Sequence, residues 1–280
     1  MSPCLRAVLF VPAVRPDRIE KALATDADMI CVDLEDGVDI RAKDLARRAL
    51  LDFLATAEFD ARRLSVRIND PTTDLGRQDL AAIADLGIPI DLLLIPKAAD
   101  TAAVDLVFKL CRQIRRSMVL IETARGLSNV FELAAHERVS ALCFGSADWS
   151  TEVGCTMEWD ALLYARSRIV HAAIDGGSIP IDGGWLQLDD EEGLESDSKR
   201  LCSLGFQGRL ALHPKQVPVI LRSFSPDSES VEHARRVIEA AEHNREGVFT
   251  VNGLMVDEPM IRRARHILES VGTACSDTTK

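Results

Sequence analysis

The stretch LLLIP at residues 92–96, followed by MVLI at residues 118–121, predicts two strands that are apolar on both faces. Strands of this kind are typical of parallel sheets that are covered by helices. Similar aliphatic runs recur along the chain and alternate with longer segments of helical period, which indicates repeated strand–helix units. Eight strands are predicted, at Ala7–Val11, Met29–Leu34, Leu64–Ile68, Asp91–Ile95, Met118–Ile121, Ala141–Phe144, Ser178–Ile181 and Arg209–Leu212.

One helix is predicted after each strand, at Pro16–Thr25, Arg41–Ala57, Asp74–Leu86, Thr101–Arg116, Gly126–Ala135, Trp159–Gly176, Glu191–Leu204 and Gln216–Ser223. Eight parallel strands with right-handed return helices close most economically into a barrel, so the predicted fold class is α/β, a TIM (β/α)8 barrel. An open doubly wound sheet is the alternative. Such a sheet usually has a glycine-rich turn after its first strand, whereas the turn here reads VPAVRPDR at residues 11–18.

A C-terminal helical appendage is expected to follow the barrel. We assign residues 1–225 to the barrel and residues 226–280 to the extension, the two forming one structural unit. The extension is predicted to contain a helix at about residues 230–246, a short stretch FTVNGLMVDEP at residues 249–259, and a last helix at Pro259–Val271.

Composition limits the classes of partner. The 280 residues include 33 Lys and Arg against 44 Asp and Glu, which gives a net charge of −11. That charge repels polyanions, so nucleic-acid binding is not expected, although a few basic side chains could still bind a small anion. The seven cysteines are scattered, with no C-x-x-C pair, and indicate neither a disulfide framework nor a zinc site. No membrane-spanning or signal segment is evident, so we expect a cytoplasmic protein.

The active site of an α/β barrel lies at the C-terminal ends of its strands. The residues that follow the predicted strands are mostly charged: Asp33, Glu35, Asp36, Arg67, Asn69, Lys97, Glu122, Asp148, Asp182 and His213. Carboxylates gathered on one rim repel each other unless a cation neutralises them, and oxygen ligands suit Mg²⁺ or Mn²⁺. Glu122 and Asp148 are the predicted metal ligands, because each directly follows one of two neighbouring strands.

Several of these residues also have a structural interpretation. Thr123 and Asp148 could cap the helices that follow them. Arg67 could bind a substrate carboxylate or carbonyl oxygen, or it could form an ion pair with the acidic rim. One of the carboxylates in residues 33–36 could do no more than hold Arg67 or Lys97.

Basic and polar residues outside the acidic rim are open to two interpretations as well. Arg15, Arg18 and Lys21 recur at three-residue spacing and could meet a phosphate at a helix N-terminus, or could form a solvated helix face. His213 could donate to a substrate or could be a turn residue before Pro214. Asp257 directly precedes a predicted helix, and its residue type and position alone predict that it is the N-cap of that helix.

Eight segments of the sequence match a known family in order: VLFVPAVRPDRIEKAL (8–23), ICVDLEDGV (30–38), VRIND (66–70), LLLIPKA (92–98), IETARGLSNV (121–130), FGSADW (144–149), LGFQGRLALHPKQV (204–217) and NGLMVDEP (252–259). Together they resemble the citrate lyase β-subunit-like branch of the HpcH/HpaI aldolase superfamily, over about residues 5–270. The resemblance implies a modified TIM barrel with Mg²⁺. It also implies a homotrimer that acts on coenzyme A (CoA) thioesters.

The resemblance assigns roles to individual residues. Glu122 and Asp148 correspond to the metal ligands of the family, and Arg67 to its substrate-binding arginine. Asp257 matches the catalytic acid/base of the active lyases, which the appendage of a neighbouring subunit delivers. The resemblance therefore replaces the N-cap interpretation of Asp257. The LED carboxylates at positions 35 and 36 resemble groups that hold metal-bound water and orient the ligands.

The expected function is a retro-Claisen lyase that splits (S)-citramalyl-CoA or malyl-CoA into acetyl-CoA and a 2-oxo acid, pyruvate or glyoxylate. Departures from the plainer malyl-type pattern at FGSADW and at DGGW (182–185) favour citramalyl-CoA. Three alternatives stay open: the β subunit of a citrate lyase complex acting on a citryl thioester, a malyl-CoA thioesterase, and a non-catalytic CoA-ester-binding homologue.

Overall fold

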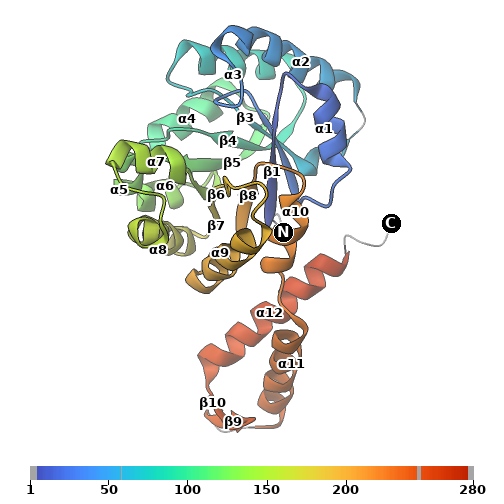
Figure 1. Ribbon diagram of the computed structural model, residues 1–280, viewed down its shortest axis with the longest axis vertical. Coiled ribbons are helices and arrows are strands. Elements are labelled where there is room, and N and C mark those ends of the chain that lie inside the picture. The colour runs from blue at the N-terminus through green and yellow to red at the C-terminus, as the bar shows by residue number, and fades with distance from the viewer. Residues whose placement is uncertain (1–4, 58, 245–246, 277–280) are drawn as a thin grey trace. The chain divides into compact units, whose positions relative to one another are not determined.

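Eight parallel strands form a closed barrel in which each strand pairs with the next and the last pairs with the first (Figure 1). The computed structural model describes residues 5–57, 59–244 and 247–276, with residues 271–276 described by backbone alone. The strands are β1 (Ala7–Pro12), β2 (Met29–Asp33), β3 (Leu64–Arg67), β4 (Ile90–Ile95), β5 (Ile114–Ile121), β6 (Val139–Phe144), β7 (Ile179–Asp182) and β8 (Gly208–Ala211). The predicted TIM (β/α)8 architecture is confirmed.

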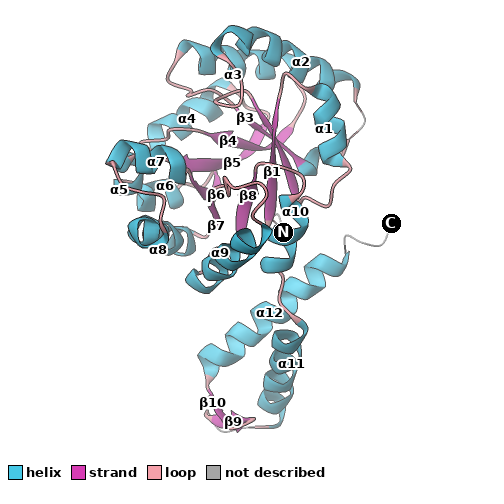
Figure 2. Ribbon diagram, viewed as in Figure 1, coloured by secondary structure: helices cyan, strands magenta, loops and turns pink. Residues whose placement is uncertain are grey.

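Helices surround the barrel on its outer side (Figure 2). They are α1 (Pro16–Leu23), α2 (Lys43–Thr56), α3 (Asp74–Leu86), α4 (Thr101–Leu110), α5 (Ala124–Ser128), α6 (Val130–Ala134), α7 (Ser146–Val153), α8 (Trp159–Gly176), α9 (Glu191–Leu204) and α10 (Gln216–Ser223). Several begin at side chains that accept a hydrogen bond from the first turn, such as Thr73 from the N–H of Gly76 and Asp190 from the N–H of Gly193.

One predicted helix end and the start of the strand after it are wrong. The helix expected over Thr101–Arg116 ends at Leu110, and β5 already begins at Ile114, which is in register with Ile90 of β4. The charged residues at the start of β5 resemble the solvent-facing positions of a helix, so the sequence pattern extended the predicted helix over them. In the structure Arg116 is half-buried and forms an ion pair with Asp91 across the two strands.

The return from β6 to β7 contains an element that the sequence pattern did not indicate. The helix α7 begins immediately after β6 and is followed by α8, so that two helices cover this crossover. The run SADWSTEV is short and largely polar, and it therefore lacks the apolar period that signals a helix. The helix expected over Gly126–Ala135 is likewise divided, into α5 and α6.

The interior of the barrel is filled by apolar side chains from seven of its eight strands, all except β3, and from the approach to β1. Among the buried ones are Leu5, Val8, Met29, Cys31, Leu92, Leu94, Met118, Leu120, Ala141, Cys143, Ile181 and Leu210. This packing makes the barrel a solid core rather than a pore. Functional side chains are therefore confined to the rim where the strands end.

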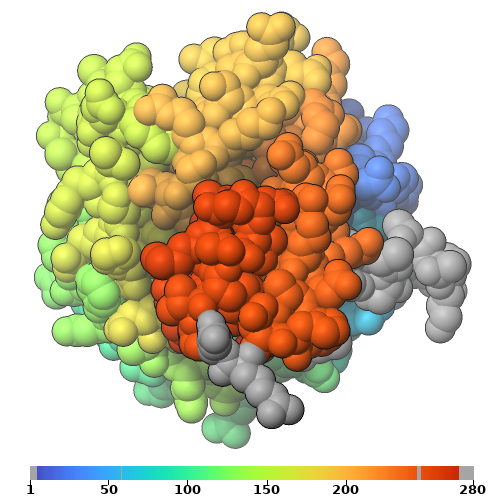
Figure 3. Space-filling model, turned by 90° about the horizontal axis from the view of Figure 1, so that it is seen from below, coloured from blue at the N-terminus to red at the C-terminus, as the bar shows by residue number. Residues whose placement is uncertain are grey.

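The chain divides into two compact units, Met1–Leu221 and Arg222–Lys280, and the boundary falls within α10. In the second unit α11 (Ser228–His243) packs against α12 (Glu258–Ser276), with a hairpin of β9 (Phe249–Val251) and β10 (Leu254–Val256) between them in sequence. Asn252 and Gly253 form the turn of the hairpin, both with positive φ, as a tight two-residue turn requires. Figure 3 draws this unit in space-filling form, in deep orange to red.

The second unit has a small core of its own, formed by Ala234, Val237, Val251, Val256, Ile261 and Ala264. Over the described residues, no helix of either unit combines the length and the apolarity that crossing a membrane needs.

Candidate active site

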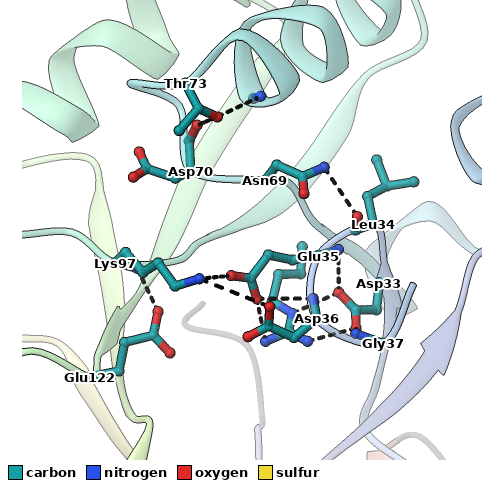
Figure 4. Close-up of polar contacts among 12 residues, drawn as sticks. Asp33, Leu34, Glu35, Asp36, Gly37, Asn69, Asp70, Thr73, Lys97 and Glu122 are labelled. Atoms are coloured by element: carbon teal, nitrogen blue, oxygen red, sulfur yellow. Dashed lines mark hydrogen bonds and ion pairs between the residues drawn. The ribbon is translucent and has the colours of Figure 1, made fainter. Parts of the chain in front are cut away.

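Glu122 lies at the end of β5 with its carboxylate enclosed at the mouth of the barrel. Its side chain is buried, and its Oε1 accepts the backbone N–H of Lys97 at 2.6 Å (Figure 4). Oε2 is also buried, but no group in the described part of the chain lies within hydrogen-bonding distance of it. A buried carboxylate oxygen without a partner is unfavourable, and a bound cation would satisfy it.

Asp148 lies in the first turn of α7, directly after β6. It shares with Glu122 a cavity of about 150 Å³, which Arg67 also lines. Asp148 does not cap its helix, because the N-cap position of α7 is Gly145 and no side chain caps it. Thr123 does cap α5, through the N–H of Gly126 at 3.0 Å. The capping interpretation is thus confirmed for Thr123 and wrong for Asp148.

The donor set at this cavity fits a hard divalent cation. Within the described ranges no group of three or more His, Cys, Asp or Glu side chains is arranged to enclose a metal. Two carboxylates, Glu122 and Asp148, would leave the other coordination positions to water and substrate. Mg²⁺ commonly keeps several waters and binds through one or two carboxylates.

The environment of Glu122 disfavours its charged form in the metal-free protein. Burial raises the pKa of the Glu122 carboxyl to about 8, and the negative charges of Glu35 and Asp148 act in the same direction. The hydrogen bond from the backbone of Lys97 opposes this effect. Glu122 is therefore mostly protonated at neutral pH until a cation replaces the proton.

Arg67, the last residue of β3, is held by two carboxylates. Its guanidinium donates to both oxygens of Asp33, at 2.7 and 2.6 Å, and its Nη1 lies 2.9 Å from Oε2 of Glu35. Burial lowers the pKa of Arg67, but the hydrogen bonds and the charges of Asp33 and Glu35 outweigh burial and raise it. The ion-pair interpretation of Arg67 is confirmed. Because Arg67 also lines the cavity, that pairing does not remove it from the site.

Lys97 contacts both Glu122 and Glu35, and its backbone conformation could not be predicted from the sequence. Its φ of 53° lies in the left-handed region, which a lysine rarely adopts. In this conformation its N–H points at Glu122 and its Nζ lies 2.6 Å from Oε1 of Glu35 (Figure 4). Asp36 is exposed, with Oδ1 3.9 Å from the same ammonium. Lys97 therefore fixes the orientation of Glu122 relative to Glu35.

The remaining candidates lie apart from this cavity. Arg15 precedes α1, Arg18 lies in its first turn and Lys21 in its last. All three are exposed, and Arg15 forms an ion pair with Asp17 at 2.9 Å. The Nδ1 of His213 lies 3.2 Å from the N–H of Lys215, as in the turn interpretation. Two further strand-end residues serve the fold: Asn69 donates to Asp79 and to the backbone of Leu34, and Asp182 is fully buried in an ion pair with Arg166.

Asp257 lies in the second compact unit, directly after β10. Its Oδ1 accepts the N–H of Met260 at 3.3 Å, so it caps the first turn of α12. The N-cap that the sequence pattern predicts at Asp257 is therefore present in the structure. Side chains around it are apolar and exposed, with Leu254, Met255 and Met260 exposed by 60%, 70% and 48%.

The fold and this geometry define a class: an α/β barrel whose mouth carries a carboxylate pair suited to a divalent cation, beside a buried arginine. The chain belongs to the HpcH/HpaI aldolase/citrate lyase family, whose model matches residues 6–214.

Similar proteins are known within this family. The chain is 35% identical to the (3S)-malyl-CoA thioesterase of Cereibacter sphaeroides, over 94% of this chain and 93% of that protein. It is 34% identical to an L-malyl-CoA/β-methylmalyl-CoA lyase of the same species, with the same two coverages. Among solved structures, CitE from Mycobacterium tuberculosis in complex with magnesium, acetoacetate and coenzyme A is 34% identical, with a TM-score of 0.83 over 95% of this chain and 98% of that chain.

Proposed function

We propose that this protein is a Mg²⁺-dependent lyase that cleaves a carbon–carbon bond in a 3-hydroxy-3-carboxyacyl-CoA thioester. The observation that carries the proposal is the buried, unpartnered Oε2 of Glu122, in one cavity with Asp148 and Arg67. The family to which the chain belongs includes aldolases and citrate lyases, and relatives acting on malyl-CoA support a thioester substrate of this kind. The CitE complex supports magnesium and coenzyme A as ligands. Mn²⁺ has similar ligand preferences and would serve in its place.

In this reaction the bond between the carbinol carbon and the methylene carbon breaks. The hydroxyl oxygen becomes the carbonyl oxygen of the 2-oxo acid, and the methylene carbon takes up a proton to give acetyl-CoA. Mg²⁺ held by Glu122 and Asp148 would supply Lewis-acid polarisation of the substrate oxygens. Citramalyl-CoA would give pyruvate and malyl-CoA would give glyoxylate.

Arg67 is placed to stabilise negative charge on the reacting oxygen. A guanidinium has five N–H donors, of which two donate to Asp33, while Nη1 forms an ion pair with Glu35. Donors that Asp33 does not use remain for a substrate oxygen in the cavity. Since the ion pairs fix the guanidinium plane beforehand, these donors need no reorganisation during the reaction. Glu35 and Asp36 would act indirectly, by orienting Arg67, Lys97 and metal-bound water.

We assign the proton transfer to Asp257, acting on a neighbouring subunit of a homotrimer. The exposed Leu254, Met255 and Met260 beside it form an apolar surface suited to burial against a second copy of the chain. Arg15, Arg18 and Lys21, which are exposed just before and along α1, would bind the phosphates of CoA.

Turnover by the isolated chain tests this function. With Mg²⁺ and no other protein, malyl-CoA or citramalyl-CoA should be consumed and a 2-oxo acid released, which a carbonyl-specific reagent detects. Activity that appears only when the other components of a citrate lyase are added would identify a complex subunit instead. If neither thioester is consumed and calorimetry detects no binding of Mg²⁺, the proposed enzyme function is contradicted.

The affinity for Mg²⁺ should depend on pH. Because the pKa of Glu122 is raised to about 8, Mg²⁺ must displace a proton at neutral pH. We expect about one proton to be released per Mg²⁺ at pH 7, and the apparent affinity to rise about tenfold per pH unit up to pH 8 and then level off. Calorimetry in buffers of different ionisation enthalpy measures this proton release. An affinity that is constant from pH 6 to pH 8 would show that Glu122 is not the group being deprotonated.

A further inference from the structure

A second cavity adjoins the one that contains Glu122 and Asp148. It has a volume of about 350 Å³, compared with about 150 Å³ for the first. Its walls come from the start of α8, the loop after β7 and one face of α9. The two cavities share three lining residues, Ser146, Gly184 and Leu186, so they meet where the β6–α7 turn faces the loop after β7.

Glycine at position 184 leaves the boundary between the two cavities open. A Cβ on Gly184 would lie 2.6 Å from Cγ of Leu212, which is too close without displacing that side chain. The backbone of Gly184 does not have positive φ, so its conformation does not require glycine. Leu212 itself lines the first cavity. A side chain at position 184 would therefore narrow the site at the junction.

The second cavity is lined by aromatic and aliphatic side chains and by arginines that already form ion pairs with aspartates. Trp159, Leu162, Trp185 and Met157 contribute the apolar part. Two buried arginines are already paired: Arg166 with Asp182 at 2.9 Å, and Arg209 with Asp197 at 2.8 Å. Glu158 and Arg200 also line the cavity, but both are exposed, so a charged group in its buried part would have only these paired side chains beside it. The cavity therefore suits an uncharged substituent.

Two polar groups at the cavity are not used by the fold. The Nε1 of Trp185 is buried and, in the described part of the chain, has no hydrogen-bond partner. Ser146 is also buried, and none of the hydrogen bonds found among the described residues involves its hydroxyl. Buried donors of this kind are normally satisfied by water or by a ligand.

Under the proposed function, on which this inference rests, the substrate is fixed at its carbinol carbon. Glu122 and Asp148 would hold the Mg²⁺ that binds the hydroxyl and carboxylate of that carbon. Ser146 belongs to the same turn as Asp148, and Gly184 follows β7, the neighbour of β6. The third substituent of the carbinol carbon would then reach the second cavity through the junction that Ser146, Gly184 and Leu186 line.

We infer that the second cavity receives this substituent, and that the enzyme acts on thioesters whose 2-oxo acid product is longer than pyruvate. The substrate class is a 3-hydroxy-3-carboxyacyl-CoA with an uncharged chain of several carbons on the carbinol carbon. A hydrogen or a methyl group at this position would leave most of the 350 Å³ cavity unused. Each methylene buried there is expected to improve kcat/KM by at least about tenfold until the cavity is full.

The test is a homologous series of these thioesters with hydrogen, methyl, ethyl, propyl and butyl on the carbinol carbon. In the native chain kcat/KM should rise from hydrogen to propyl. In the Gly184→Ala variant the ratio of kcat/KM for the propyl substrate to kcat/KM for malyl-CoA should fall about tenfold or more, and cooperative thermal unfolding checks that the variant folds. Leu188→Ala is the matched control, because Leu188 is exposed in the same loop and lines neither cavity.

A second measurement does not depend on the variant. Straight-chain 2-oxo acids should inhibit the native enzyme with inhibition constants that fall as the chain lengthens from two to six carbons. Cleavage of malyl-CoA or citramalyl-CoA with kcat/KM falling from methyl onwards would overturn the inference and leave the proposed function standing. Cleavage of no member of the series would overturn both. Equal loss on all substrates in Gly184→Ala, with no chain-length effect in the native enzyme, would assign the second cavity to another part of the substrate.

Discussion

Replacing Asp257 by asparagine is expected to lower the rate of thioester cleavage by about 10²–10⁴-fold, while Mg²⁺ and the CoA ester still bind. The carboxyl is the proposed proton donor to the methylene carbon of the acetyl-CoA enolate, and an amide cannot take that role. The structure allows the catalytic role to be separated from the capping role. Asparagine caps a helix about as well as aspartate, so the hydrogen bond to the N–H of Met260 is kept.

Asp257→Ala supplies the matched comparison. It should lose as much activity as Asp257→Asn and should also lower the free energy of unfolding by about 1 kcal/mol, because the cap is removed. Stopped-flow turnover and denaturant unfolding of both variants measure the two effects separately. Full turnover by Asp257→Asn would leave Asp257 as a cap and nothing more.

The same residue tests the contribution of a second subunit. Mixing Asp257→Asn with Arg67→Ala, each inactive alone, should restore part of the activity after subunit exchange, because some sites then combine an intact Arg67 with an intact Asp257. Mass measurement in solution should show the trimer. No recovery after demonstrated exchange would place Asp257 in the site of its own chain.

Replacing Glu122 by glutamine should weaken Mg²⁺ binding by at least about 100-fold, since even residues that only orient metal ligands cost 10–100-fold when mutated. Activity should fall to that of the native enzyme in EDTA. The side chain keeps its size, and its amide oxygen can still accept the N–H of Lys97, so the site should keep its shape. Glu152→Gln is the control, because Glu152 is an exposed acid on the same helix as Asp148.

Glu122→Gln also has an expected effect on the metal-free protein. The pKa of Glu122 is raised to about 8 in the folded state, so between its ordinary value and pH 8 the folded state binds more protons than the unfolded state. The metal-free native chain should therefore lose stability as the pH rises through this range. The glutamine variant should lack this dependence, which thermal unfolding at several pH values would show. Parallel pH profiles for both proteins would mean that Glu122 does not carry the proton.

The barrel was predictable because its strands are short apolar runs. The C-terminal ends of the predicted strands then show which residues lie on the rim of the barrel. Glu122 and Asp148 follow strands and Arg67 ends one, so their gathering into one cavity follows from the fold alone. The pairing of Arg67 with Asp33 and Glu35 was one of two interpretations, and only coordinates decide it, since residue order does not give side-chain direction.

Other features depend on contacts that no local pattern encodes. The φ of Lys97 is set by its simultaneous bonds to Glu122 and Glu35, which lie 25 and 62 residues away. Asp182 ends a strand as Arg67 does, but it is neutralised by Arg166 from the middle of α8. The second cavity is lined by residues from five separate segments, so its existence could not be predicted from any one of them.

The identity of the products tests the proposed reaction most directly. The purified chain, saturated with Mg²⁺, is incubated with citramalyl-CoA or malyl-CoA, and the CoA species and acids are separated by chromatography. The account predicts acetyl-CoA and the matching 2-oxo acid in equal amounts, with both lost in EDTA. Free CoA with intact citramalate or malate would contradict cleavage of the carbon–carbon bond and identify the protein as a thioesterase.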